Sequence, residues 1–281
     1  MKTSIKWVLL AGTTIWLCAN LPADAAQHKN SDSKLQISTD GSGKIVLSWN
    51  GKGQLLEARG KHGQYKKVRA VSPVVIAPTE EQASYRLAAD GGVVSGNVVG
   101  YVNLSLPPGL SLIANPLFYT NNSLGFWLPH PPAGTQIYKY TADSGYEVST
   151  FDELEDKWSN PDLQVPIGEG FFFRNPSDTV YAQTFVGEVL QGTLVNPLPA
   201  SYSTKGSLVP ITYTLSQHGI PGEAGDELRT YTNDGLGGGN YNISVYDPAS
   251  GWVPDLVLGV GQGFWIHKTN PQDWVRYFTV N

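Results

Sequence analysis

Cysteine, histidine and charge are all scarce in this chain. Its 281 residues include one cysteine, Cys18, and five histidines, and charged residues make up only 15%, where about a quarter is typical of soluble proteins. A lone cysteine excludes an internal disulfide framework. The histidines have no metal-ligand spacing, and no second cysteine could complete a zinc site. The sequence therefore predicts no metal site and no cofactor site.

Long apolar runs are missing as well. The stretch from Trp7 to Ala19 is shorter than the about 20 residues that a membrane-spanning helix requires. It follows the positive charges of Lys2 and Lys6, and a small-x-small site ends at Ala25. This is the pattern of a cleaved signal peptide. We predict a signal peptide at 1–25, a flexible segment at 26–33, and no membrane span after cleavage.

A lipoprotein signal is the alternative at the N-terminus, because Cys18 is present. However, Leu17 precedes that cysteine, where lipoprotein signals usually carry a small residue. Cleavage after Ala25 would remove two of 19 basic residues and one of 24 acidic residues, which leaves 17 and 23 and a net charge of −6. That balance disfavours nucleic acid as a partner. An exported chain without cysteine points to a bacterial protein, either extracellular or periplasmic, at the cell surface.

The residues that are abundant favour strands. There are 31 glycines and 19 prolines, with 14 tyrosines, 9 phenylalanines and 8 tryptophans. Aromatic residues fit a pleated surface, glycine and proline punctuate turns, and no long run shows the helical period of 3.6. The sequence predicts an all-β protein.

An internal repeat organises the second part of the chain. Residues 161–173 return as residues 254–266, a shift of 93 that aligns Phe185 with Phe278. Each copy contains a Gly-x-Gly followed by an aromatic strand, whereas a dinucleotide-binding loop needs a following helix. The glycines are expected to permit a bulge or a positive φ at the strand entrance. We predict two homologous β-units, at 97–190 and 191–281.

The first part of the chain alternates between short strands and glycine-rich turns. Such strands occur at Leu35–Ser38 and Lys44–Trp49, and the pattern closes with Tyr85-Arg86-Leu87. This spacing is typical of a β-sandwich, predicted at 34–89 with a linker at 90–96. The segment resembles a fibronectin type III-like module of secreted proteins from Verrucomicrobia and Planctomycetes on Ile45 to Trp49, Gly53 to Ala58, Gly63 to Tyr65 and Tyr85 to Leu87. The resemblance implies a spacer or a binding appendage.

The repeat is also similar to known sequences. Val99 to Leu104, Leu106 to Leu117 and the terminal Trp274 to Asn281 resemble an uncharacterised β-repeat of exported proteins from the same phyla. The resemblance covers 97–281. It implies no activity and no binding residues.

The densest acidic cluster, Asp152 to Asp156, is the candidate for chemistry. Two carboxylates could hydrolyse a glycosidic bond, or several could bind calcium. The cluster lacks the spacing and the glycine of a calcium-binding loop, and its counterpart around Asp247 keeps one acid. A solvated loop is the simpler interpretation. We therefore predict no catalytic residues, with a secreted carbohydrate-active hydrolase as the alternative.

Aromatic residues are the other candidates, because they are numerous for cores of this size. Exposed rings near Asn, Asp and Gln suit sugar stacking and protein interfaces alike. The sequence therefore predicts a non-catalytic binding or structural protein of the bacterial envelope or extracellular matrix, with a glycan or an envelope protein as its partner. The predicted binding residues are Trp127, Tyr146, Trp158, Tyr241 and Trp252.

The chain ends in an alternating apolar segment at 275–281. Such a strand either pairs within its own unit or adds to the sheet edge of another molecule. The internal copy around Phe185 must pair locally because the chain continues through it. We expect local pairing at the terminus too, with self-association as the alternative.

Overall fold

The protein is all-β, as predicted. The computed structural model describes residues 34–41, 43–60, 63–88 and 95–280. Within these ranges the helices are two single turns, α1 (Leu124–Trp127) and α2 (Leu215–His218). The predicted signal peptide at 1–25 and segment at 26–33 lie outside the described residues. No described helix is long and apolar enough to cross a membrane.

The strands before residue 89 contribute to two sheets. One is three-stranded, in the order β1-β2-β5, and the other is five-stranded, with β4, β3 and β6 followed by β7 (Val99–Leu106) and β13 (Tyr181–Glu188). Apolar side chains of both sheets meet in one core, around Leu47, Leu55 and Tyr85. The strands of this part are β1 (Gln36–Thr39), β2 (Ile45–Ser48), β3 (Gln54–Arg59), β4 (Lys66–Lys67), β5 (Val74–Ile76) and β6 (Gln82–Ala88).

The second of these sheets extends past the predicted linker. Strand β6 pairs with β7 (Val99–Leu106), and β7 pairs in turn with β13 (Tyr181–Glu188). Val99 and Tyr101 of β7 therefore complete the N-terminal core. All described residues belong to one compact unit, and the linker at 90–96 falls largely outside them. The domain boundaries that we drew from the sequence stay a prediction.

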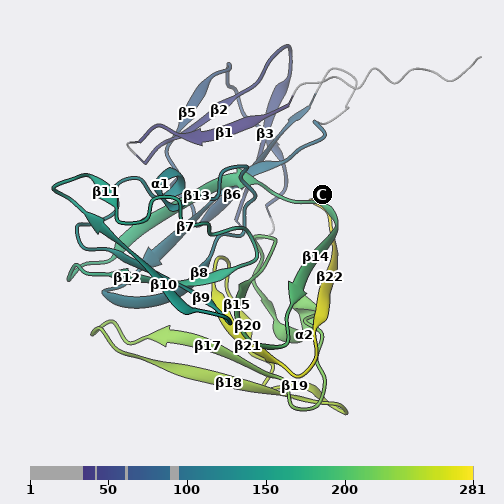
Figure 1. The fold of residues 1–281 in the computed structure, drawn as a ribbon. Coiled ribbons are helices and arrows are strands. Elements are labelled where there is room, and N and C mark those ends of the chain that lie inside the picture. Colours follow the sequence, from purple (N-terminus) through teal and green to yellow (C-terminus); the bar gives the residue numbers. More distant parts are fainter. Residues whose placement is uncertain (1–33, 42, 61–62, 89–94, 281) are drawn as a thin grey trace, which may run out of the picture. The chain divides into compact units, whose positions relative to one another are not determined.

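Two further five-stranded sheets have corresponding strand orders, β11-β10-β9-β12-β8 and β19-β18-β17-β21-β15. Figure 1 shows both sheets. The first uses β8 (Gly109–Ala114), β9 (Gln136–Thr141), β10 (Gly145–Asp152), β11 (Lys157–Trp158) and β12 (Gly170–Asn175). The second uses β15 (Ser201–Gly206), β17 (Glu227–Asn233), β18 (Gly239–Asp247), β19 (Gly251–Val253) and β21 (Gly263–Lys268).

Two short ladders complete the second half of the chain. Strands β14 (Gly192–Leu198) and β22 (Gln272–Phe278) pair with one another, as do β16 (Tyr213–Thr214) and β20 (Val257–Leu258). Val275 of β22 lies opposite Val195 of β14. The terminal strand therefore pairs locally, which confirms the preferred prediction for this segment.

The repeated Gly-x-Gly motifs join the two halves of the repeat to each other. Gly168 and Gly261 have φ of +84° and +69°, so the expected positive φ is present at the first glycine of both motifs. The amide of Gly206 donates to the carbonyl of Gly168 over 3.0 Å, and the amide of Ala114 donates to Gly261 over 2.9 Å. The motif of the first repeat unit thus binds β15 of the second unit, and the motif of the second unit binds β8 of the first.

The strand register corrects one detail of the predicted repeat. The turn between β21 and β22 is two residues shorter than the turn between β12 and β13. As a result, Phe185 lies opposite Val102, whereas Phe278 lies opposite Gly192, the counterpart of Gly100. Phe185 and Phe278 are therefore not equivalent in the sheets, although the two sequences align them.

The turn α2 buries an imidazole. Thr214 and Gln217 form a capping box at its start, and Gly219 ends it with φ of 65°. His218 is 2% exposed, and its Nδ1 lies 3.2 Å from Nη1 of Arg276. Arginine only donates hydrogen bonds, so this ring nitrogen accepts one. Burial first, and then the charge of Arg276, lower the pKa of His218 from 6.5 to about 4.

The buried imidazole predicts acid sensitivity. Below pH 6.5 the unfolded chain protonates His218 while the folded chain does not, so the free energy of unfolding falls until the pH reaches about 4. We expect a loss of about 2–3 kcal/mol between pH 7 and pH 4.5 from this group. Urea unfolding at both pH values should show a smaller loss for His218→Gln than for the unaltered chain. Equal losses would contradict the prediction.

Candidate functional site

A cleft of about 410 Å³ lies beside α1. Its lining contains the rings of Tyr119, Phe126 and Trp127, together with three carboxamides, those of Asn115, Asn121 and Asn122. This volume falls within the range of about 300–1,000 Å³ that small-ligand sites occupy. Phe126 is 46% exposed, and its ring centroid lies 5.0 Å from that of Tyr119. The cleft therefore offers open aromatic surface beside hydrogen-bonding groups.

The repeated stretch that begins at Pro161 holds α1 in place. The amide of Leu124 donates to the carbonyl of Leu163 over 2.9 Å, and the amide of Gly125 donates to the carbonyl of Pro161 over 2.8 Å. The first amides of a helix have no partner within the helix, so these bonds satisfy them. Just before the turn, the amide of Ser123 donates to Oδ1 of Asn121 over 3.0 Å. Phe126 and Trp127 are thus fixed by backbone contacts with the repeat motif.

Trp127 has a buried donor without a partner. Its ring packs against Phe171 and Phe185 at centroid distances of 5.4 Å each. Its Nε1 is inaccessible to solvent and forms no hydrogen bond within the described part of the chain. Most buried polar groups in native proteins are satisfied, and an exception calls for a water, a ligand or a functional reason. This exception is a residue that lines the cleft.

Trp158 and Trp252 are core residues, which corrects their prediction as binding residues. They are 1% and 3% exposed, so neither presents a ring face to a partner. Trp158 Nε1 donates to the carbonyl of Leu128 over 2.7 Å, and Trp252 Nε1 donates to Ile220 over 2.9 Å. Trp158 therefore links β11, which follows the acidic turn, to the segment after α1. In the same way, Trp252 links β19 to the segment after α2.

Tyr146 and Tyr241 lie together, away from the cleft beside α1. They are 49% and 44% exposed. They border an aromatic cluster between the sheet that contains β9 and β12 and the sheet that contains β17 and β21. Its inner contacts are Phe172 with Tyr231 at 5.5 Å and Trp265 with Tyr140 at 4.6 Å. Burial raises the pKa of Tyr146, and the nearby Tyr241 raises it further. These rings join the sheets, and only the rim of the cluster remains open.

The acidic cluster forms an exposed turn. Oδ1 of Asp152 accepts hydrogen bonds from the amides of Leu154 and Glu155 at 2.8 and 3.3 Å. Glu155 pairs with Lys157 at 2.6 Å, and Asp156 lies 2.9 Å from Nδ1 of His130. The carboxylates thus stabilise the turn and pair at the surface. Among the described residues, no group of three or more His, Cys, Asp or Glu side chains could hold a metal ion.

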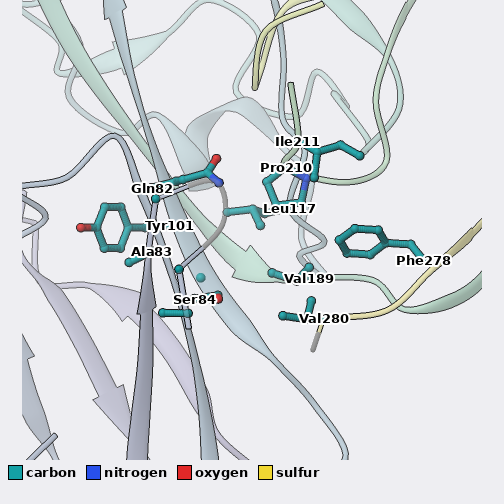
Figure 2. A pocket seen from close by; sticks show the side chains of 14 residues that line it. Gln82, Ala83, Ser84, Tyr101, Leu117, Val189, Pro210, Ile211, Phe278 and Val280 are labelled. Atoms are coloured by element: carbon teal, nitrogen blue, oxygen red, sulfur yellow. The ribbon is translucent and has the colours of Figure 1, made fainter. Parts of the chain in front are cut away.

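Another cavity is too small to serve as a site. It has a volume of about 90 Å³, well below the about 300 Å³ at the lower end of ligand pockets. Figure 2 shows that Leu117, Val189, Phe278 and Val280 converge on it. It is a packing gap between β6, β7 and the end of β22.

The cleft residues other than Trp127 were not predicted as a site. Asn121 and Asn122 lie just before Ser123, the residue that precedes α1, and Tyr119 lies two residues before Asn121. The sequence signal was available, since adjacent asparagines before a short apolar turn mark a capped loop. What the sequence did not show is that this loop faces β13, because that contact joins residues more than sixty positions apart.

Comparisons with known proteins do not extend this picture. No protein-family model matches the chain, and neither a curated protein nor a solved structure matches it.

Proposed function

We propose that the protein is an exported, non-catalytic binding protein of the bacterial envelope or extracellular matrix, and that it binds a glycan in the cleft beside α1. The single observation that carries the proposal is the combination of exposed aromatic rings and carboxamides in one cleft. Aromatic faces pack against the apolar faces of sugar rings, and amides hydrogen-bond to hydroxyl groups. The resemblance of residues 34–89 to a fibronectin type III-like module fits this proposal.

The surroundings of the acidic turn favour binding over hydrolysis. A glycosidase needs two carboxyl groups that flank the scissile bond, one of them with a raised pKa. The carboxylate of Asp152 is occupied by two backbone amides. Glu155 and Asp156 pair with basic side chains at the surface.

Export is supported by the pattern of residues 1–25, and sequencing the N-terminus of the secreted protein tests the predicted cleavage after Ala25.

A glycan array with the mature chain tests the function. We expect binding to a defined subset of glycans, and Phe126→Ala should weaken the best of them about five- to tenfold, because one stacked ring contributes about 1–1.5 kcal/mol. Trp127→Phe keeps a ring in place and removes the donor, so it tests the N–H separately. Tyr241→Ala is the matched control, since Tyr241 is similarly exposed at 44% but lies outside the cleft.

Two results would overturn the proposal. The first is binding that Phe126→Ala and Tyr241→Ala affect equally. The second is turnover in a hydrolase screen that Asp152→Asn or Glu153→Gln abolishes, since this would favour the enzyme.

A further inference from the structure

Among the described strands, β14 has a partner on one side only. It pairs with β22 in a two-stranded sheet, and the two run side by side in Figure 1. Its counterpart in the first half of the repeat, β7, lies between two neighbours, β13 and β6. An isolated two-stranded ribbon has marginal stability in water, and an unpaired edge is a template for another strand.

The correspondence of β14 with β7 follows from their connections. Each strand leads through a turn of two residues into the edge strand of a five-stranded sheet, β8 or β15. Gly170 lies opposite Ala114 in one sheet, and Gly263 lies opposite Gly206 in the other. The equivalent positions therefore differ by 92, which aligns Asn103 with Val195.

This alignment shows which backbone groups of β14 are free. The amide of Asn103 donates to the carbonyl of Glu81, just before β6, over 2.8 Å. Amide directions alternate along a strand, so the amides of Thr193 and Val195 point away from β22. No hydrogen bond from either amide to another strand occurs in the described chain. Proline lacks the amide and is tolerated on edge strands, and Pro197 occupies the next outward position.

A groove runs along this free edge. It has a volume of about 630 Å³ and is lined by Thr193 to Pro197 of β14. Phe118, Ile167 and Leu208 contribute apolar side chains to its lining, and Phe118 is 36% exposed. An extended peptide in this groove would gain backbone hydrogen bonds from β14 and apolar contacts from the remaining lining.

We propose that β14 accepts an extended segment of another protein as an added antiparallel strand, in the way that β7 accepts β6. The segment should alternate small or apolar residues with polar ones. In β6, Ala83, Tyr85 and Leu87 are buried, while the intervening side chains are half-buried. This surface is separate from the cleft beside α1.

A single strand fits this edge better than a second copy of the chain. A second copy would bring β22 along with its β14, because the two strands are paired over seven residues. The groove has a lining beyond β14, to which Phe118 and Ile167 contribute. The groove of about 630 Å³ beside β14 matches one extended segment, whereas a second copy would also have to place its β22 beyond the added strand.

A labelled peptide with the sequence of residues 80–88 is the probe, tested by fluorescence anisotropy with the full mature chain. We expect saturable binding that Val195→Pro weakens at least tenfold. This substitution removes the outward amide and leaves the ladder with β22 in place. Val195→Thr is the matched control, because it keeps the amide and the branched shape, and it should bind as the unaltered chain does.

Hydrogen exchange of the unaltered chain gives a second measurement that does not depend on the folding of the variant. The peptide should slow exchange of the Thr193 and Val195 amides at least tenfold. Unchanged exchange at saturating peptide would overturn the proposal. Protection of the same amides by self-association without peptide, seen together with dimers in sedimentation, would also overturn it, because the occupant would then be a second copy.

Discussion

Replacing Lys268 by methionine is expected to lower the free energy of unfolding by about 3–5 kcal/mol, because it leaves a buried carboxylate without its counter-charge. The ammonium of Lys268 pairs with Asp226, and both side chains are 0% exposed. Lys268 Nζ also donates to the carbonyl of Pro221 over 3.2 Å and to Oε1 of Gln272 over 2.6 Å. Chemical denaturation of the mature chain measures the effect.

Asp226 explains why the loss is so large. Burial acts to raise its pKa, but hydrogen bonds from Lys268 and from the amides of Thr269 and Glu223 outweigh burial, so its pKa is lowered. A lowered pKa means that this carboxylate stabilises the fold above the unfolded value near pH 4, and that the contribution disappears as the pH falls through the folded value. The methionine variant should therefore lose this acid dependence.

The first repeat unit has uncharged residues at the two positions that correspond to the ion pair of Lys268 and Asp226. Asn175 stands where the second half has Lys268, and its Nδ2 donates to the carbonyls of Leu106 and Thr179 over 3.0 and 2.8 Å. Thr135 stands at the position of Asp226. We expect the double variant Lys268→Asn with Asp226→Thr to be more stable than Lys268→Met. Lys157→Met is the control, since its partner Glu155 is exposed, and its stability should not change measurably.

Replacing Gly170 by valine is expected to destabilise the protein by about 3 kcal/mol, at the upper end for overpacking. The reason differs from the one that the sequence suggested. Gly170 has no positive φ, but a Cβ there would lie 2.8 Å from the carbonyl oxygen of Lys205. Backbone atoms cannot give way as a flexible side chain can, so the two halves of the repeat would have to separate.

The repeat supplies a second position and a control. A Cβ on Gly263 would lie 2.7 Å from the carbonyl oxygen of Ile113, so Gly263→Val should cost a similar amount. Gly96→Val is the matched control, because a Cβ at Gly96 meets no atom within 4 Å. Thermal unfolding of the three variants compares them. Equal melting temperatures for Gly96→Val and Gly170→Val would refute the close-approach explanation.

The candidate site shows how far sequence reasoning reached. Trp127 was singled out and does line a cleft, whereas Trp158 and Trp252 are buried. All three are tryptophans close to turns and polar residues, so composition alone cannot separate them. Their difference arises because Leu128 and Ile220 accept hydrogen bonds from two of the indoles. Those contacts connect positions about thirty residues apart.

The sequence by itself determined the all-β class and the positions of the repeated glycines. Turn residues and aromatic strands are local properties, and the positive φ of Gly168 and Gly261 follows from a local requirement for glycine. Tertiary structure decided what depends on distant segments. Strand β6 continues into the sheet of β7, and a turn shorter by two residues shifts Phe278 away from the position of Phe185. Strand pairing and burial are set by long-range packing, which no local pattern encodes.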